Sequence, residues 1–523
     1  MYQMRNTYNG LIITILVLGI LIGILNAEPV KAETQVAGII SSKTTWTQTN
    51  SPYSLTGNIL VDAEVTLTVE PGVTVHLKDY YIRVDGTLQA KGTNNNQITF
   101  TGTGQISFRQ TSIDWNQTTQ SGSIIEYSNL ETIYVGISES SPKISNNLIS
   151  RMGVGGSALI IHNTITEGIT VTSDADSPII SNNIISEKFK VATHTINRSG
   201  LLVISNNTIN NGLSIGSNAG SVQLLHNTIS GEIRSSGTTM ISNNVIDGGI
   251  VLAGGVPTVT NNTIIGQEIG ISLDYVSASI LYNSITAKET GIKLVPSYSY
   301  SMYGSRSEAY IFGNVIFDCN LAGIHVGKGS VQAGTSGQYN NATIKGNVIR
   351  DNYYGIESYA STSIEGNLII NNYFGVSGGN SIKFNTVANN SYGLVRFGNI
   401  LSYNNILDNS EFNVHFGSSE LGFHRPSDVD VSNNWWGTTD SQIIQGLIFD
   451  FYDDFDLGKA NFSPLLSEFS SGAPTSTFMP IDLVVDFTPS QEPFPITTIA
   501  LASIVLIAVS GTGILIFFKK YRK

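Results

Sequence analysis

Three residues whose side chains could bind a polar ligand follow the same dipeptide in this sequence. Lys293, His325 and Glu357 each come directly after a Gly-Ile pair. If the three Gly-Ile segments are neighbouring strands of a parallel sheet, these side chains form a column with a spacing of about 4.8 Å. An ammonium, an imidazole and a carboxylate in such a column could hydrogen-bond to the hydroxyl groups of a sugar.

Three insertions interrupt the repeat beside this expected column, always at the same corner. The insertions are at 296–308, 327–341 and 417–428. The remaining candidate ligand-binding residues are Tyr298, Tyr300, Tyr303, Tyr339 and His415. We expect a rim of aromatic rings over the column, which suits stacking on sugars. The alternative is an ordinary solvated strand face with decorated loops.

An asparagine two residues before an aliphatic residue supplies the phase of the repeat. Most of these asparagines are 16 to 24 residues apart, and a glycine followed by an aliphatic residue lies between many of them. A period near 20 with many strand formers is typical of a solenoid. Because asparagine tolerates the left-handed backbone region and its amides can stack, we assign the series a structural role at the corners. This asparagine ladder comprises Asn147, Asn163, Asn183, Asn207, Asn227, Asn244, Asn262, Asn283, Asn314, Asn347, Asn367, Asn385, Asn404 and Asn434.

Each repeat is expected to contain two short strands joined at two corners, with apolar positions alternating inward. One rung buries too little apolar surface to offset the entropy of ordering about 20 residues, so the rungs must stack. The ladder predicts about 14 rungs and an all-β fold. A leucine-rich repeat is the rival solenoid, but isoleucine and valine dominate and no L-x-x-L-x-L frame exists.

Apolar segments at both ends indicate export and anchoring. Residues 1–32 contain an apolar run behind Arg5 and then small residues, which predicts a signal peptide, with a retained anchor as the alternative. Residues 495–518 are uncharged and long enough for a transmembrane helix, and 519–523 form a basic cytoplasmic tail. The proline-containing segment 469–494 is expected to be a stalk. The sequence therefore predicts a single-pass protein of the cell membrane with an extracellular solenoid.

Charge and composition narrow the classes of ligand. The formal net charge of −12 argues against nucleic acid as a partner. The single cysteine, Cys319, excludes an intrachain disulfide and is expected to be buried. The acidic run "DFYDDFDLG" at 450–458 lacks the D-x-D-x-D-G frame of a calcium loop, and we interpret it as part of an end cap. No cofactor is expected, and calcium is the one alternative.

At this point the chain resembles the pectin-lyase-like superfamily of right-handed, single-stranded parallel β-helices. The resemblance rests on the N-N-x-[IV] and G-I rungs, the "VEPGVTV" opening and the "NNWWGTTD" closing segment. Within this superfamily, the chain is most similar to extracellular β-helix repeat proteins, including those that resemble NosD, a periplasmic copper-processing family. The resemblance implies an N-terminal cap with the first rungs at 33–130, repeats at 131–440 and a C-terminal cap at 441–468.

Enzymes of this superfamily have motifs that are absent from the chain, which contains no G-H-G, R-I-K or D-P-H-D. Copper would require clustered His, Met or Cys, whereas the seven histidines are dispersed. His162 and His226 share one repeat position, but two rungs lie between them. We therefore expect a non-catalytic surface protein for carbohydrate binding or adhesion, whose partners are the membrane and extracellular glycans or surface proteins. A polysaccharide lyase or hydrolase is the first alternative, and NosD-like copper handling is the second.

Overall fold

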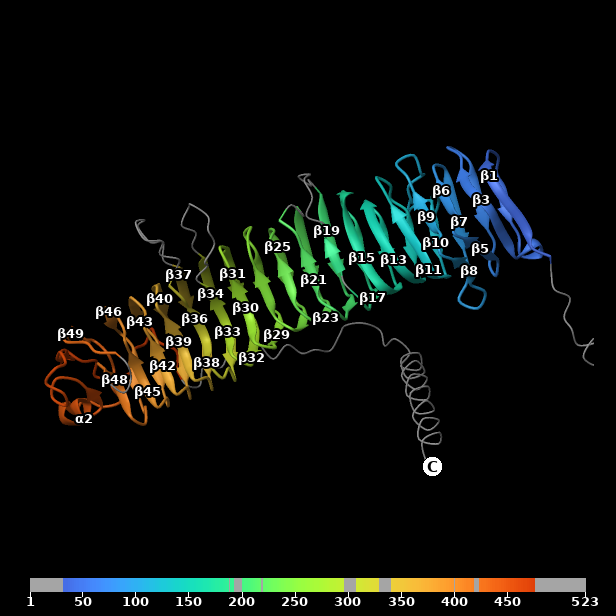
Figure 1. The fold of residues 1–523 in the computed structure, drawn as a ribbon. Helices are drawn as coiled ribbons and strands as arrows, with labels where there is room; N and C mark the ends of the chain where they lie inside the picture. Colours follow the sequence, from blue (N-terminus) through green and yellow to red (C-terminus); the bar gives the residue numbers. More distant parts are fainter. Residues whose placement is uncertain are drawn as a thin grey trace, which may run out of the picture. The chain divides into compact units, whose positions relative to one another are not determined.

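The computed structural model describes residues 32–187, 189–191, 200–217, 220–295, 307–328, 340–398, 400–417 and 423–475. These residues form a parallel β-solenoid of about 17 turns, in which each strand pairs with equivalent strands one turn before and after it (Figure 1). The expected all-β solenoid is confirmed. The turns outnumber the ladder asparagines because residues 34–130 already form turns that lack this asparagine.

The predicted signal peptide, apart from Ala32, and the predicted transmembrane helix lie outside the described residues. Within the part of the chain that the structure describes, no helix is both long and apolar enough to cross a membrane.

A regular turn contains three strands rather than the expected two. In one turn, β37 (Asn341–Lys345), β38 (Val348–Arg350) and β39 (Tyr354–Ser358) follow one another. The chain bends once more between the ladder asparagine and the Gly-Ile strand, which adds a third corner. The inward side chains of the three strands, Ile344, Ile349 and Ile356, are fully buried, and their equivalents in other turns continue the core.

The strands stack in three parallel rows. Row 1 extends from β2 (Thr44–Trp46) to β46 (Ile400–Ser402), and row 2 extends from the first half of β1 (Thr34–Ile40) to β47 (Asn405–Leu407). Row 3 contains the Gly-Ile strands and the candidate site. Its strands are the second halves of β1 and β3 (Tyr53–Val61), then β6 (Tyr81–Val84), β9 (Gln105–Phe108), β11 (Ser128–Ile137), β13 (Leu148–Gly156), β15 (Thr164–Ala175), β18 (Phe189–Val191), β21 (Leu213–Ile215), β24 (Ile233–Ser235), β27 (Ile250–Leu252), β30 (Ile269–Leu273), β33 (Thr290–Leu294), β36 (Ala322–Val326), β39, β42 (Phe374–Ser377), β45 (Tyr392–Val395) and β48 (Phe412–His415). The long strands β1, β3, β11, β13 and β15 contribute to rows 2 and 3 at once, with register shifts where they bend.

At the corner between rows 1 and 2, one residue adopts the left-handed backbone conformation and the next residue forms the amide ladder. The residue before each ladder asparagine has a positive φ, as at Asn146 (φ 57°) and His162 (φ 57°). The ladder residue itself is buried, and Nδ2 of Asn147 donates to Oδ1 of Asn163 at 3.0 Å. The same bond recurs from turn to turn up to Asn434, whose Oδ1 accepts from the amide of Asn404. The left-handed backbone and the amide ladder therefore belong to different residues of the pair.

A second asparagine ladder occupies the corner between rows 2 and 3. Asn352, Asn372, Asn390 and Asn409 are buried, and each of the first three donates from Nδ2 to Oδ1 of the next at 3.0 Å. Cys319, in the turn before, donates its backbone N–H to Asn352. Cys319 is buried as expected, and burial raises the pKa of its thiol to about 11.

The C-terminal end of the stack is closed by a short helix and loops. Helix α2 (Ser441–Gly446) precedes β50 (Ile448–Phe449), the last strand that pairs with row 3. Asp450 is fully buried and accepts hydrogen bonds from Gln445, Tyr452 and Ala460, so the acidic run is bonded into the cap.

The described start of the predicted stalk packs against the solenoid. The backbone N–H of Ser470 donates to Oδ1 of Asn405 at 2.8 Å, and the carbonyl of Pro474 accepts from Thr386 one turn back. Ser470 and Ala473 are buried. Residues 470–475 thus belong to the folded body, and the segment predicted as a free stalk is shorter at its start.

Candidate functional site

The structure places the three column residues on neighbouring strands of row 3. Lys293 on β33 pairs in register with His325 on β36, and His325 pairs with Glu357 on β39. Lys293 and His325 are half-buried, whereas Glu357 is only 6% exposed. His415 continues the column, but Ser377 and Val395 stand between it and Glu357.

A hydrogen bond joins the two central members of the column. Nδ1 of His325 lies 2.7 Å from Oε2 of Glu357, and the ring of His325 is 5.9 Å from that of Tyr359. Tyr359 donates its hydroxyl to the other oxygen of Glu357 at 2.7 Å. One carboxylate oxygen is therefore engaged from the preceding turn, by His325, and the other from the same turn, by Tyr359.

Arg396 joins this network from the corner after β45. Its Nη2 lies 3.5 Å from Oε1 of Glu357 and 3.3 Å from the hydroxyl of Tyr359. Its Nε and Nη2 also donate to Oγ of Ser377, at 3.0 and 2.8 Å. Arg396 has a φ of 51°, a left-handed conformation that is rare for a residue with a long side chain. The network of His325, Glu357, Tyr359, Ser377 and Arg396 is called the Glu357 network below.

The electrostatics of the Glu357 network keep its carboxylate ionised. Burial raises the pKa of Glu357, but hydrogen bonds from His325 and Tyr359 and the charge of Arg396 outweigh it, so the pKa lies below its usual value. Burial and the bond to Glu357 raise the pKa of Tyr359, which stays a protonated donor. An ionised Glu357 makes Nδ1 of His325 the donor, and in the neutral imidazole Nε2 is then the proton acceptor.

Two groups beside the network have no partner among the described residues. The ammonium of Lys293 and Nε2 of His325 make no hydrogen bond or ion pair there. The ring of Tyr359 is 40% exposed. The site therefore presents an ammonium, a ring nitrogen and an aromatic face, which suit the hydroxyl groups and apolar face of a sugar.

His415 does not reach this network. It is buried, stacks on Phe449 with 4.3 Å between ring centroids, and accepts the backbone N–H of Gly417 at Nδ1. Burial lowers the pKa of His415 to about 4, so its ring is neutral at pH 7. Its role is packing at the C-terminal end of row 3 rather than the ligand contact expected from its register.

The expected aromatic rim cannot be placed, because Tyr298, Tyr300, Tyr303 and Tyr339 lie outside the described residues. Sequence reasoning missed Tyr359, Ser377 and Arg396. Ser377 follows Glu357 in register and could have been found by counting one more turn. Tyr359 and Arg396 lie in corners just beyond strand ends, where the repeat gives no direction for a side chain.

No described part of the chain suggests a metal centre. Within those residues, no group of three His, Cys, Asp or Glu side chains lies close enough to hold a metal ion. His162 and His226 each stand in a left-handed corner, three turns apart with Asn182 and Asn206 at the equivalent corners between them. Copper needs clustered His, Met or Cys donors, and the described residues do not fit such a site.

The fold and this surface network define the class as a parallel β-solenoid with a charged, partly buried cluster on one face. Residues 221–334 match the family model described as periplasmic copper-binding protein (NosD). This confirms the NosD-like resemblance for that stretch, which covers Lys293 and His325 but ends before Glu357. No curated protein matches the chain.

Among solved structures, the chain is similar to a mannuronic acid specific polysaccharide family 6 lyase enzyme from human gut microbiota. The identity is 11%, the alignment covers 77% of this chain and 87% of that one, and the TM-score is 0.20.

Proposed function

We propose that this protein is an extracellular, membrane-anchored, right-handed parallel β-helix that binds a glycan at the Glu357 network without cleaving it. The observation that carries the proposal is the contact set around Glu357, in which His325 and Arg396 surround one ionised carboxylate. Lys293, one turn before, adds an ammonium without a described partner. The chain has a net charge of −12, so the grouping of the cationic side chains of Lys293 and Arg396 near one carboxylate differs from its acidic composition.

The chemistry of the cluster supports a sugar as ligand. Lys293 and Arg396 can donate to hydroxyl groups, and Nε2 of His325 can accept from one. Tyr359 is 40% exposed, and the part of its ring that the guanidinium of Arg396 leaves uncovered offers a surface for the apolar face of a pyranose. Because Glu357 fixes His325 and Tyr359 before a ligand arrives, little side-chain entropy is lost on binding.

The location outside the cytoplasm rests on the predicted signal peptide at 1–32 and the predicted membrane helix at 495–518. The description of the matching family as periplasmic supports the same side of the membrane. We propose that the helix holds the solenoid at the outer face of the cell membrane, where glycans are accessible.

A glycan array probed with the full chain in detergent micelles tests the proposal. The double variant His325→Ala/Glu357→Ala should lose at least tenfold in signal for every glycan that the wild type binds. Lys190→Ala is the matched control, since Lys190 occupies the same register several turns away and is exposed. Equal signals from wild type and a folded double variant would contradict the proposal.

A polysaccharide lyase is the second candidate, favoured by the His325–Glu357 bond. In β-elimination, Nε2 of His325 would take the proton next to a uronate carboxylate, and the bond to the adjacent glycosidic oxygen would break as a double bond forms. Tyr359 could donate a proton to the leaving oxygen. Hydrolysis is less well supported because it requires two carboxylates, and Glu357 is the one carboxylate in the described network. Ultraviolet absorbance of an unsaturated product, abolished in His325→Ala, would establish the lyase.

A further inference from the structure

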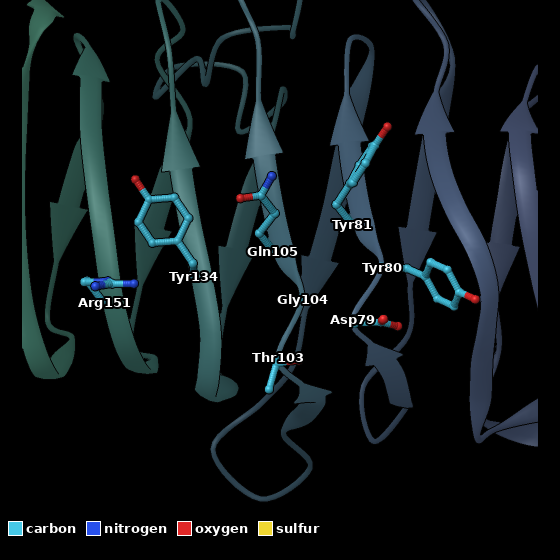
Figure 2. A pocket seen from close by; sticks show the side chains of 8 residues that line it. All are labelled: Asp79, Tyr80, Tyr81, Thr103, Gly104, Gln105, Tyr134 and Arg151. Carbon is cyan, nitrogen blue, oxygen red and sulfur yellow. The ribbon is translucent and has the colours of Figure 1, made fainter.

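A second group of polar and aromatic side chains lies on row 3 at the opposite end of the solenoid. Tyr81, Gln105, Tyr134 and Arg151 pair in register on the successive strands β6, β9, β11 and β13 (Figure 2). The equivalent position is glycine in most later turns, for example Gly291. A Cβ at Gly291 would lie 2.6 Å from the carbonyl oxygen of Gly323, so side chains are excluded there. The early turns therefore depart from the repeat at a position that is elsewhere reserved for glycine.

The ring of Tyr134 lies flat against the sheet because two glycines make room for it. A Cβ at Gly136 would lie 3.1 Å from Cε1 of Tyr134, and one at Gly153 would lie 2.3 Å from its hydroxyl oxygen. Gly136 and Gly153 are paired on adjacent turns, so the ring spans both. Figure 2 shows the ring face-on from outside, with Gln105 and Arg151 on either side of it. One face of Tyr134 is thus covered by backbone, whereas the residue as a whole is only half-buried and the guanidinium of Arg151 lies over its ring.

A surface hollow of about 460 Å³ surrounds this ring. The guanidinium of Arg151 is exposed and lies 5.6 Å from the ring centre of Tyr134, and Tyr81 is 39% exposed. Arg151 makes no ion pair with any described residue, although the chain as a whole is acidic. The hollow is lined by Asp79, Tyr80, Tyr81, Thr103, Gly104, Gln105, Tyr134 and Arg151.

We infer that this hollow is a second glycan site, specific for a sugar that carries a carboxylate. The part of the Tyr134 ring that backbone leaves uncovered would stack on the apolar face of a pyranose, and Arg151, beside it, would hold the carboxylate through its paired N–H groups. Gln105, on the other side of Tyr134 from Arg151, would bond to hydroxyl groups of the next sugar unit. From Tyr81 to Arg151 the column covers three strand spacings, about 14 Å, which accommodates two to three sugar units. The inference rests on the proposed glycan-binding function for its ligand class and places that ligand at different residues.

Titration of the full chain in detergent with two oligosaccharides of equal length tests the site. The probes are hexagalacturonate, which is acidic, and maltohexaose, which is neutral. Arg151→Gln should weaken hexagalacturonate binding at least tenfold and leave any maltohexaose binding unchanged, while Tyr134→Ala should weaken the binding of both. The exposed Arg109, outside the hollow, provides the control Arg109→Gln, which should bind as the wild type does.

Gly153→Ala tests the geometry without removing any contact group. Its methyl group would displace the hydroxyl end of Tyr134, so it should also weaken binding of both probes. Wild-type affinity for hexagalacturonate in all three folded hollow variants would overturn the inference. If binding is lost only in His325→Ala/Glu357→Ala, the proposed function stands and this site does not. A wild type that binds neither probe also overturns the site, and the wider glycan array then decides the proposed function separately.

Discussion

His325 and Glu357 are 32 residues apart in the sequence and 2.7 Å apart between Nδ1 and Oε2. The solenoid creates this proximity because residues one full turn apart stand in register on adjacent strands. An insertion between the two strands lengthens the chain without changing the register. Residues for a binding site can therefore be collected along row 3 whatever the length of the loops between them.

Arg396 is expected to stabilise the fold through its side-chain hydrogen bonds and to destabilise it through its left-handed backbone conformation. Its left-handed φ of 51° costs a non-glycine residue about 1 kcal/mol, which glycine does not pay. Removing its side chain leaves Glu357 and Ser377 with fewer donors, at a cost of about 1–2 kcal/mol. Arg396→Ala should therefore lower the free energy of unfolding more than Arg396→Gly does, by about 1 kcal/mol. Urea denaturation followed by circular dichroism measures the difference, and equal stability of the two variants would exclude backbone strain at this corner.

The amide ladder should be a major source of stability. Oδ1 of Asn314 accepts both the backbone N–H and Nδ2 of Asn283, and its own Nδ2 donates to Asn347. Asn314→Ala leaves the buried N–H of Asn283 without its acceptor, so we expect a loss of about 3 kcal/mol in the free energy of unfolding. The exposed Asn320 gives the control Asn320→Ala, which should change stability by less than about 0.5 kcal/mol. A similar small effect of both substitutions in urea denaturation would refute a stabilising ladder.

The sequence was sufficient to predict the solenoid and the register of its ladder. The phase of the repeat aligned Lys293, His325 and Glu357, because a deviation from the period moves into the corners and not into the strands. Counting repeats along the sequence gives the correct register wherever a turn contains the Gly-Ile pair that marks its row 3 strand. It predicts which residues are neighbours but not how deeply they are buried.

The third strand of each turn escaped prediction although its signal was present. Asn352 and Asn372 are each followed by an aromatic pair and a glycine, a pattern that marks the corner between rows 2 and 3. The prediction of two strands per turn merges this stretch with its neighbour, because a three-residue strand is too short to display periodicity. Tyr359 and Arg396 were missed for a different reason: left-handed and short corners set their direction, and composition does not encode that geometry.

The docked segment 470–475 should protect the chain from proteolysis. Asn405 is fully buried, accepts the backbone N–H of Ser470 and donates to Thr386, which in turn bonds to Pro474. Asn405→Ala removes the central member of this set, so the segment should be cleaved several-fold faster by proteinase K under native conditions. The control is Ser402→Ala, because Ser402 is half-buried and lies in β46, just before the corner that leads to Asn405. Unchanged cleavage after residue 469 in Asn405→Ala would mean that packing of Ala473 alone holds the segment.

His415 should make the C-terminal turns sensitive to acid. Its pKa of about 4 in the folded chain lies below the ordinary value of 6.5, so the unfolded state binds more protons between these pH values. Stability is therefore present above about pH 6.5 and is lost as the pH falls toward 4, by about 2 kcal/mol between pH 7 and pH 5. Protonation of Nδ1 would also break the bond from the Gly417 amide. Backbone amides in β48 should therefore be about 20-fold less protected from hydrogen exchange at pH 5 than at pH 7, after correction for intrinsic exchange rates.

His415→Phe keeps an aromatic ring against Phe449 and should remove this pH dependence. The exposed His424 gives the control His424→Phe, which should retain it. Equal pH dependence in wild type and His415→Phe would assign the acid sensitivity to another group.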